Sequence, residues 1–400
     1  MRKHLGPFAF VITTLFFLYE FVSRIAPSLA SDAIAHDFNL SHAEFGTLAS
    51  LFFWVYAPMQ LAVGLLIDRF QVRRLVVPAI AVCAAGVLIF AWAPNVLFAS
   101  LGRLGVGLGA SFAFVSALYV VNHWFAPTRF ALLSGAVNAV GMVGTAVGAI
   151  ALTGLIETVQ WRQAFIYIGL FGFAISVAAF LVLRDPPMPR DASDQHDLGV
   201  RAKLRDIVAV PKIWLISFVG ALYYMPINVF GGLWGNAEIV ADHKLSSVGA
   251  ETAVSMLFWG MAAGSVSSGW LSDRLGHRKW LVVGGASAMA VCFSVAIYAP
   301  VHDALYLSVL LFFGGMFGGA QMLTFAMAKE LLPIAVAGTV IAFVNMVAIG
   351  CALLFQPLIG VLVDDAGGHF GIAMLTIPVC LVAAALLAAT LTEERHPDHM

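Results

Sequence analysis

Long apolar segments, each bounded by charged residues, proline or glycine, follow one another along almost the whole chain. Each is about 20 residues or longer, which is enough for a helix to cross the hydrocarbon layer of a bilayer. The strands of a membrane barrel would instead alternate over about ten residues. The pattern therefore predicts an all-α integral membrane fold with twelve spans, at residues 8–30, 44–67, 75–94, 96–125, 131–155, 164–183, 211–236, 248–270, 280–300, 304–328, 334–361 and 370–392.

The composition agrees with this pattern and excludes several classes of protein. Hydrophobic residues make up 61% of the 400 residues and charged residues 11%, whereas soluble domains contain about 25% charged residues. An ordinary soluble enzyme, a disordered protein and a nucleic-acid-binding protein are therefore excluded. The formal net charge of −1 gives no bulk field that would attract polyanions.

No motif for a cofactor or a metal is found in the sequence. The four cysteines are isolated in apolar runs without a CxxC pair, so neither a metal site nor a disulfide framework is indicated. The glycine-rich run that begins at Arg103 lies in a membrane span and lacks the strand context of a phosphate-binding loop. We expect no cofactor, no metal and no enzymatic activity.

Lysine and arginine placement predicts the orientation in the membrane. If both termini are cytoplasmic, only four of the 21 Lys and Arg residues fall elsewhere: Arg24, Arg103, Arg162 and Lys244. Cytoplasmic loops carry an excess of basic residues, so this orientation is favoured. We expect a multi-pass protein of a bacterial inner membrane with both termini in the cytoplasm.

One long polar stretch divides the chain. Residues 184–210 are predicted to be a cytoplasmic linker, with a short surface helix around 200–208. The linker separates six spans in residues 1–183 from six spans in residues 211–400. We predict an N-terminal and a C-terminal six-helix bundle.

The two predicted bundles share an internal repeat. Residues 51–74 align without gaps to residues 256–279, and the matching pairs include Phe53/Phe258, Trp54/Trp259, Ala57/Ala262, Gly64/Gly269, Asp68/Asp273, Arg69/Arg274 and Arg73/Arg278. Parallel repeats of six helices imply two pseudo-symmetric bundles around a central cavity.

The repeated segment carries the pattern G-x-x-x-D-R-x-x-x-R after the second and the eighth span. This pattern, with the helix count, the central linker and the orientation, resembles the major facilitator superfamily over the whole chain. The first copy departs from the family pattern, because Gln71 and Val72 stand where a glycine is common, whereas the second copy keeps Gly276. The resemblance implies a monomeric secondary active transporter that works by alternating access.

In the fold implied by the resemblance, the repeated loops form a cytoplasmic gate. Asp68 would meet the positive end of the eleventh span and Asp273 that of the fifth span. The gate residues are Asp68, Arg69, Arg73, Asp273, Arg274 and Arg278. The alternative for the arginines is that they only fix the orientation of the chain. Acids contribute little to orientation, so the gate is favoured for the two aspartates.

Three charged residues fall well inside the predicted spans: Glu20, Arg24 and Arg103. Each costs about 2.5–3.5 kcal/mol at a helix centre, so each is a functional candidate. Glu20 and Arg24 are four residues apart and can pair on one helix face. Arg24 would bind an anionic group in the cavity and Glu20 would be its protonatable partner. A self-neutralising structural pair is the alternative.

Arg103 lies in the fourth span and has two interpretations. It resembles an arginine of the proton-antiporter branch that is associated with coupling, which would make it a second candidate for proton coupling beside Glu20. The alternative is a structural arginine that binds backbone carbonyls or extends to the outer surface.

Polar residues in other spans are candidates for substrate contacts. Pro226, Gly231 and Gly232 should weaken the seventh span, and broken helices are where transporters place such contacts. The candidates beside Arg24 are Tyr19, Tyr119, Tyr223, Tyr224, Asn228, Gln321 and Asn345. Trp234 and Asn236 are predicted to lie in an interfacial belt, and Gln60 and Gln356 to be structural.

These features favour a transporter of a small organic anion that moves with protons, with the substrate assignment resting mainly on Arg24. One alternative is a proton-coupled exporter of amphiphilic compounds, suggested by Arg103 and the aromatic, Met-rich spans. Another is a membrane sensor that kept the transporter fold. The expected partners are a small-molecule substrate, protons and the lipid bilayer, with no nucleic acid.

Overall fold

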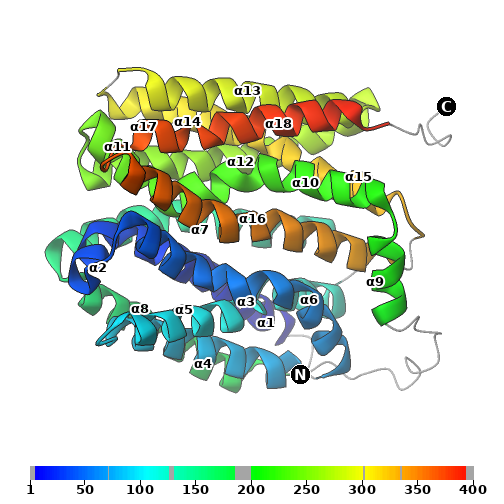
Figure 1. Ribbon diagram of the computed structural model, residues 1–400. Coiled ribbons are helices and arrows are strands. Elements are labelled where there is room, and N and C mark those ends of the chain that lie inside the picture. Colours follow the sequence, from blue (N-terminus) through cyan, green and yellow to red (C-terminus); the bar gives the residue numbers. More distant parts are fainter. Residues whose placement is uncertain are drawn as a thin grey trace.

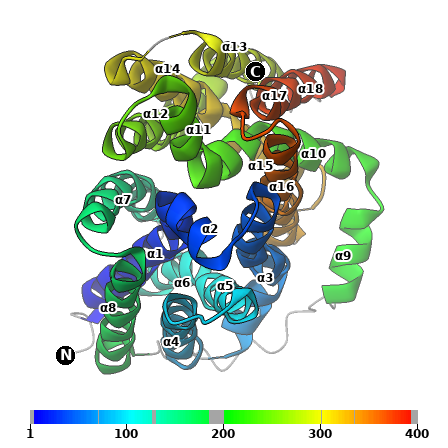
Figure 2. The ribbon, with the colours of Figure 1, turned by 60° about the vertical axis from the view of Figure 1, so that its left-hand side comes forward.

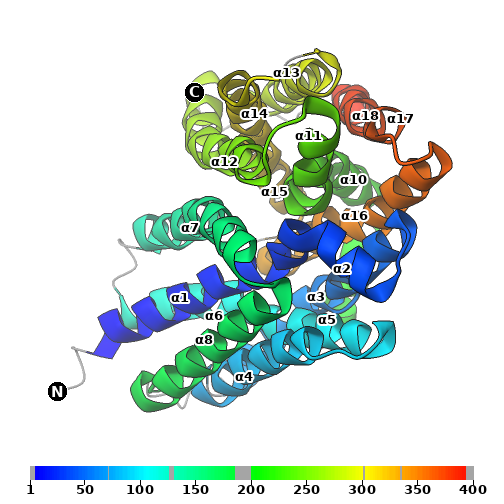
Figure 3. The same ribbon diagram turned by 90° about the vertical axis from the view of Figure 1, so that its left-hand side faces the viewer.

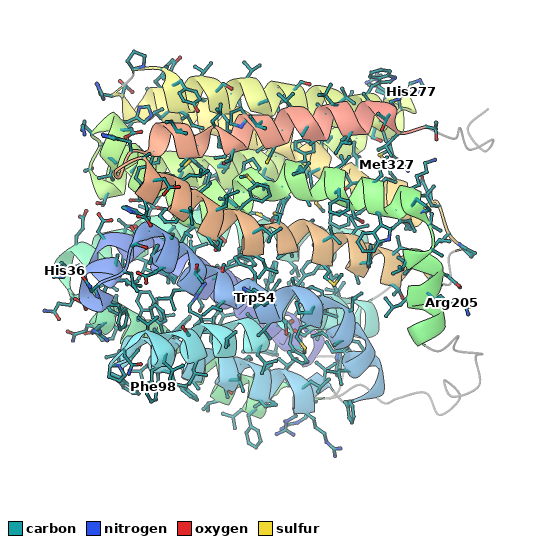
Figure 4. All side chains as sticks on the ribbon, in the orientation of Figure 1. His36, Trp54, Phe98, Arg205, His277 and Met327 are labelled. Carbon is teal, nitrogen blue, oxygen red and sulfur yellow. The ribbon has the colours of Figure 1, made fainter. Side chains whose placement is uncertain are left out.

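The computed structural model is helical throughout the part of the chain that it describes, which comprises residues 5–70, 72–125, 130–184, 200–300, 302–333 and 336–392. The long helices lie roughly along one direction (Figure 1). His36 on α2 and Arg205 on α9 lie at opposite ends of the bundle (Figure 4). Within these residues no strand is present, and the all-α fold is confirmed.

The first six spans are built from eight α-helices and one 3₁₀ turn. They are α1 (Leu5–Ile25), η2 (Ala26–Ala30), α2 (Ser31–Phe38), α3 (His42–Arg69), α4 (Val72–Ala91), α5 (Val96–Ala110), α6 (Ala113–Trp124), α7 (Phe130–Thr158) and α8 (Trp161–Val182). The first span runs through α1, η2 and α2, and the fourth through α5 and α6.

The C-terminal part begins with the short helix α9 (Val200–Val208), at the position predicted for a surface helix in the linker. The remaining elements are α10 (Pro211–Pro226), η4 (Ile227–Trp234), α11 (Gly235–His243), α12 (Ser247–Leu275), α13 (Lys279–Tyr298), α14 (Ala304–Gly318), η5 (Gly319–Met322), α15 (Leu323–Lys329), α16 (Ala337–Asp365), α17 (Phe370–Met374) and α18 (Thr376–Thr390).

All twelve predicted spans coincide with helices, with ends that differ by a few residues. Eleven helical segments of the described chain are long and apolar enough to cross a membrane. The remaining span is α12, whose 29 residues include several serines and glycines. At 1.5 Å per residue, α12 is also long enough to cross. The prediction of a twelve-helix membrane fold is confirmed.

The helices form two groups, α1–α8 and α10–α18, which lie one below the other in Figure 3. The groups meet mainly where α3 packs against α16 and α7 packs against α12 (Figure 2), and η2 also contacts η4 and α11. The two-bundle arrangement therefore agrees with the internal repeat. The division at residues 184–210 stays a prediction, because residues 185–199 lie outside the described part.

Two spans are interrupted where they approach the centre of the molecule. Pro27 follows the end of α1 and stands in the 3₁₀ turn η2. Pro226 ends α10, and the chain continues as the π-helical turn η4. Proline has no N–H to donate to the preceding helical turn, and a π turn changes the direction of the backbone. Both interruptions therefore have a cause in the local sequence. The weakening predicted for the seventh span is confirmed.

Close helix contacts within the C-terminal group depend on glycine. A Cβ atom added to Gly264 on α12 would overlap the backbone of Met316 on α14, and one added to Gly319 would overlap the backbone of Gly264. Small residues let helix backbones approach in a membrane, where packing rather than the hydrophobic effect holds helices together.

We predict that Gly264→Ala lowers thermal stability, because the α12–α14 backbones must separate to admit a methyl group, which costs about 1–3 kcal/mol. The measurement is the melting temperature of the purified protein in detergent. Gly269→Ala on the same helix is the matched control, since nothing lies within 4 Å of the position of its added Cβ. Equal melting temperatures for the two variants would contradict this packing argument.

Candidate functional site

A central cavity lies between the two groups of helices and is lined from both. Its walls are formed by Arg24, Ile25, Ala49, Phe53 and Arg103 from the N-terminal group and by Ile227, Asn228, Gly232, Leu233, Phe258 and Gln356 from the C-terminal group. The residues come from both interrupted spans, from α3 and α5, and from α12 and α16. The free space is close to that of one water molecule, so this conformation is nearly closed around the site.

Arg24 brings a positive charge to this cavity from the last turn of α1. Its side chain is 8% exposed, and its Nη1 lies 3.7 Å from Oε1 of Glu20. The guanidinium also stacks over the Phe21 ring, 4.0 Å from the centroid. In the described part of the chain, no group hydrogen-bonds to the guanidinium. Arg24 therefore has hydrogen-bond donors free to meet an anionic group.

Glu20 lies one helical turn before Arg24 and is fully buried. Neither of its carboxylate oxygens has a hydrogen-bond partner among the described residues. Tyr56 on α3 and Tyr224 on α10 lie close enough to interact electrostatically with both charges of the pair. A buried carboxylate whose only ionic contact is 3.7 Å long is weakly compensated, so its charge state is sensitive to what Arg24 binds.

Arg103 reaches the same cavity from α5, but its guanidinium is held by the backbone. It donates to the carbonyls of Ser23 at 3.3 Å, Arg24 at 3.3 Å and Ala49 at 3.0 Å. Pro27 has no N–H, so the Ser23 carbonyl lacks its helical donor. Arg103 thus replaces donors that the break after α1 removes and ties α1, α3 and α5 together.

Asn228 and Gln356 face the cavity from the C-terminal group. Asn228 stands in the π turn η4, and Gln356 lies on α16 and donates from Nε2 to the Asn228 carbonyl at 3.0 Å. Nδ2 of Asn228 and Oε1 of Gln356 have no hydrogen-bond partner among the described residues. We predicted a structural position for Gln356. The structure adds it to the site, together with Phe53 and Phe258, which the internal repeat had paired.

The other candidates for substrate contacts are not gathered at the cavity. The Tyr19 hydroxyl lies against Gly172 on α8, and the Tyr223 hydroxyl donates to the Phe317 carbonyl at 2.5 Å. Gln321 is buried on η5, near Gly220 of α10. These three side chains point into their own groups of helices.

The three remaining candidates for substrate contacts lie outside the cavity lining. Asn345 on α16 donates to Oε1 of Gln60 on α3 at 3.4 Å, which bridges the two groups away from the cavity lining. Tyr224 is near the Glu20–Arg24 pair. Tyr119 is half-buried on α6 and is not among the residues that line the cavity.

The prediction of an interfacial belt is wrong for Trp234, which is buried, and stays a prediction for Asn236, which is half-buried. Trp234 is 1% exposed, and its Nε1 donates to the Gln356 carbonyl at 3.0 Å. Nδ2 of Asn236 donates to Glu251 at 2.9 Å and to the Ser247 carbonyl at 3.1 Å. The polar edges of both side chains are used by protein groups, and Trp234 packs inward rather than meeting the membrane interface.

An acid–helix contact joins the two groups on the side of the cavity that the predicted orientation places outside. Asp364 near the end of α16 accepts from the backbone N–H groups of His42 at 3.0 Å and Ala43 at 2.8 Å, at the start of α3. Its Oδ1 is also 2.8 Å from Nδ1 of His42. A carboxylate is stabilised at the positive end of a helix. Gly46 and Gly360 let α3 and α16 meet backbone to backbone beside this contact.

The predicted cytoplasmic gate is described in part. The side chains of Asp68, Arg69 and Asp273 lie outside the described residues. Arg73 donates to the Phe180 carbonyl at 2.8 Å, Arg274 stacks on Trp270, and Arg278 pairs with Glu330. Each of these three contacts lies within one group of helices.

A family model described as Major Facilitator Superfamily matches residues 9–347 and residues 216–399. The probable nitrate/nitrite transporter NarK2 of Mycobacterium tuberculosis is 29% identical over 382 residues, which cover 90% of this chain and 89% of that protein. The probable L-galactonate transporter of Escherichia coli is 26% identical over 416 residues, covering 94% and 86%.

A solved structure shares the fold. It is a bacterial homolog to the human lysosomal transporter Spinster in an inward-facing and unoccupied conformation, with a TM-score of 0.74 and 18% identity. The match covers 97% of this chain and 96% of that chain. The arrangement of both helix groups is therefore shared over nearly the whole length.

We predict that Asp364→Ala opens the outer side of the cavity, because α3 loses a carboxylate that accepts two of its first N–H groups. The measurement is the labelling rate of a cysteine introduced by Ala49→Cys, using a membrane-impermeant maleimide added outside. The rate should rise several-fold. Asp365→Ala is the control, since its side chain has no such contact in the described residues. Unchanged labelling in Asp364→Ala would show that this contact does not hold the outer side closed.

Proposed function

This chain belongs to the Major Facilitator Superfamily as a multi-pass membrane transporter, and we propose that it moves a small organic anion by alternating access, coupled to protons. One observation carries the proposal. The Arg24 guanidinium lies in a nearly closed cavity between the two helix groups, and its one ion pair, to Glu20, is 3.7 Å long. A buried arginine in a membrane span is costly unless an anion or a functional partner compensates it.

The charges around the cavity support an anionic substrate. The charged residues that line it are Arg24 and Arg103, both positive. The two terminal nitrogens of Arg103 donate to three backbone carbonyls and only its Nε is without a partner in the described residues, so Arg24 is the better group to bind the substrate. An arginine can bind a carboxylate through two parallel hydrogen bonds. The names of the two relatives above, for nitrate/nitrite and L-galactonate, also refer to anions.

Glu20 supplies a route for proton coupling. An anion that binds Arg24 competes with Glu20 and leaves this carboxylate buried without a counter-charge. Burying an unpaired charge is unfavourable, so Glu20 then takes up a proton. Substrate and proton would therefore load together and leave together, which is symport.

Alternating access requires that the two sides of the cavity close in turn. The Asp364 contact and the glycine seam of α3 and α16 would serve the outer side, and the Asp68 and Asp273 loops the cytoplasmic side. We place the protein in a bacterial inner membrane as a monomer, with both termini in the cytoplasm. The excess of Lys and Arg in the loops on that side supports this orientation.

We expect Arg24→Gln to reduce anion uptake by about tenfold to hundredfold, because the substrate loses a charge-assisted pair of hydrogen bonds. Arg24→Lys should retain only part of the activity, since an ammonium lacks the planar fork. The assay is uptake into proteoliposomes under an imposed proton gradient. Arg205→Gln on α9, whose side chain is 82% exposed, is the control. Full uptake by Arg24→Gln would remove the basis of the anion assignment.

We expect Glu20→Gln to separate transport from proton movement. A glutamine has the size of a protonated glutamate but does not titrate at this position. Exchange of labelled anion across the membrane should persist, whereas uptake driven by a proton gradient should fall at least about tenfold. A variant that still accumulates the anion under a proton gradient would show that Glu20 is not the coupling group.

A further inference from the structure

Three buried side-chain atoms of the cavity lining lack partners in the described part of the chain: Nε of Arg103, and two amide atoms from the C-terminal group that differ in kind. Nδ2 of Asn228 is a donor and Oε1 of Gln356 is an acceptor. Both side chains are at least 97% buried, and both line the cavity that Arg24 also lines. Buried polar groups are nearly always hydrogen-bonded, so this pair calls for a group that is absent from the protein itself.

The orientation of the Gln356 amide is fixed by its other contact. Its Nε2 lies 3.0 Å from the Asn228 carbonyl oxygen, which can only accept a hydrogen bond. The NH₂ end of the amide must therefore face that carbonyl. The oxygen end is left as an acceptor, and only a ligand with an N–H or O–H group can satisfy it.

The charges of the cavity decide which donor is suitable. Among the residues that line it, the charged ones are two arginines, and no Asp or Glu is present. An ammonium group beside Gln356 would face two positive charges with no acid among these lining residues to balance it. A neutral hydroxyl carries no such penalty. It can also donate to Oε1 of Gln356 while it accepts from Nδ2 of Asn228.

We infer that the substrate is a hydroxymonocarboxylate. Its carboxylate binds Arg24, and its hydroxyl binds Gln356 and Asn228 on the opposite wall. This inference rests on the proposed function and makes Gln356 and Asn228 the residues that determine specificity within it. A simple anion such as nitrate has no donor and would leave Gln356 unsatisfied. The ligand enters when the cavity is wider than in this nearly closed conformation.

The test compares matched acids that differ by one or more hydroxyl groups: glycolate and acetate, lactate and propionate, mandelate and phenylacetate, gluconate and hexanoate. Binding to the purified full-length protein is measured from the ligand-dependent rise in melting temperature. Proton-coupled transport of the same acids is measured in proteoliposomes. We expect the hydroxylated member of at least one pair to bind about tenfold to hundredfold more tightly.

The variant Gln356→Met removes the acceptor with little change in side-chain length. The preference for the hydroxylated acid should fall to about twofold or less, while the deoxy acid keeps its affinity. Asn228→Ala should weaken the same preference independently. Gln60→Met is the matched control, because Gln60 is a buried glutamine between the helix groups that does not line the cavity. The preference should persist in this control.

The outcomes separate the two proposals. The inference is wrong if wild-type protein binds nitrate or the deoxy acids as tightly as the hydroxy acids, or if Gln356→Met keeps the preference for hydroxy acids. Water would then be the hydrogen-bond partner of the two amide atoms. In that case Arg24→Gln still abolishes anion binding. If no anion of the panel binds, or if Arg24→Gln binds them as well as wild type, the proposed anion transport itself fails.

Discussion

The hydrocarbon layer offers no water to the backbone, and the rest of this structure depends on how that constraint is met. Every interruption of a span must find substitute hydrogen-bond donors inside the protein. At the break between α1 and η2 the substitute is Arg103, which binds the carbonyls of Ser23 and Arg24 and a third carbonyl on α3. The charge of Arg103 is thereby tolerated in the span, and the backbone that carries Arg24 is held in place. A single arginine thus links the fold of the first span to the position of the candidate binding group.

The same constraint makes the unsatisfied groups informative. Partners are supplied for the broken backbone at α1 and for the Tyr223 hydroxyl, yet Glu20, Asn228 and Gln356 keep atoms without hydrogen bonds. Together with Arg24 they gather around the seam between the two helix groups. A site that must bind and release a substrate cannot satisfy its own polar groups, because the ligand would then gain nothing by entering. The unsatisfied amide atoms of Asn228 and Gln356 on the wall opposite Arg24 agree with a binding cavity.

The outer seam shows how two groups of helices can be joined and still separate. The start of α3 and the end of α16 meet through glycines and through one carboxylate, Asp364, on two backbone N–H groups. Such contacts are short and directional, and water can replace them when the seam opens. An apolar interface of the same size inside a membrane would gain little from association, since lipid is equally apolar. Close packing and a few polar contacts therefore suit a seam that can separate, as the proposed alternating access requires.

The amino-acid sequence predicts the twelve spans, the break in the seventh span, the short helix α9 and the repeat that relates the halves, because span length, proline and repeated motifs act locally. It also placed Arg24 and Asn228 among the candidates that line the cavity, since charge and broken helices stand out in an apolar chain. The helix face that meets the cavity could not be predicted in this way. These spans are apolar on nearly every side, so their sequence carries little facial pattern. Tyr19 and Tyr223 therefore turned out to point into their own bundles, Trp234 to lie inside rather than at the membrane interface, and Gln356 to join the site, because each position depends on packing between helices far apart in the chain.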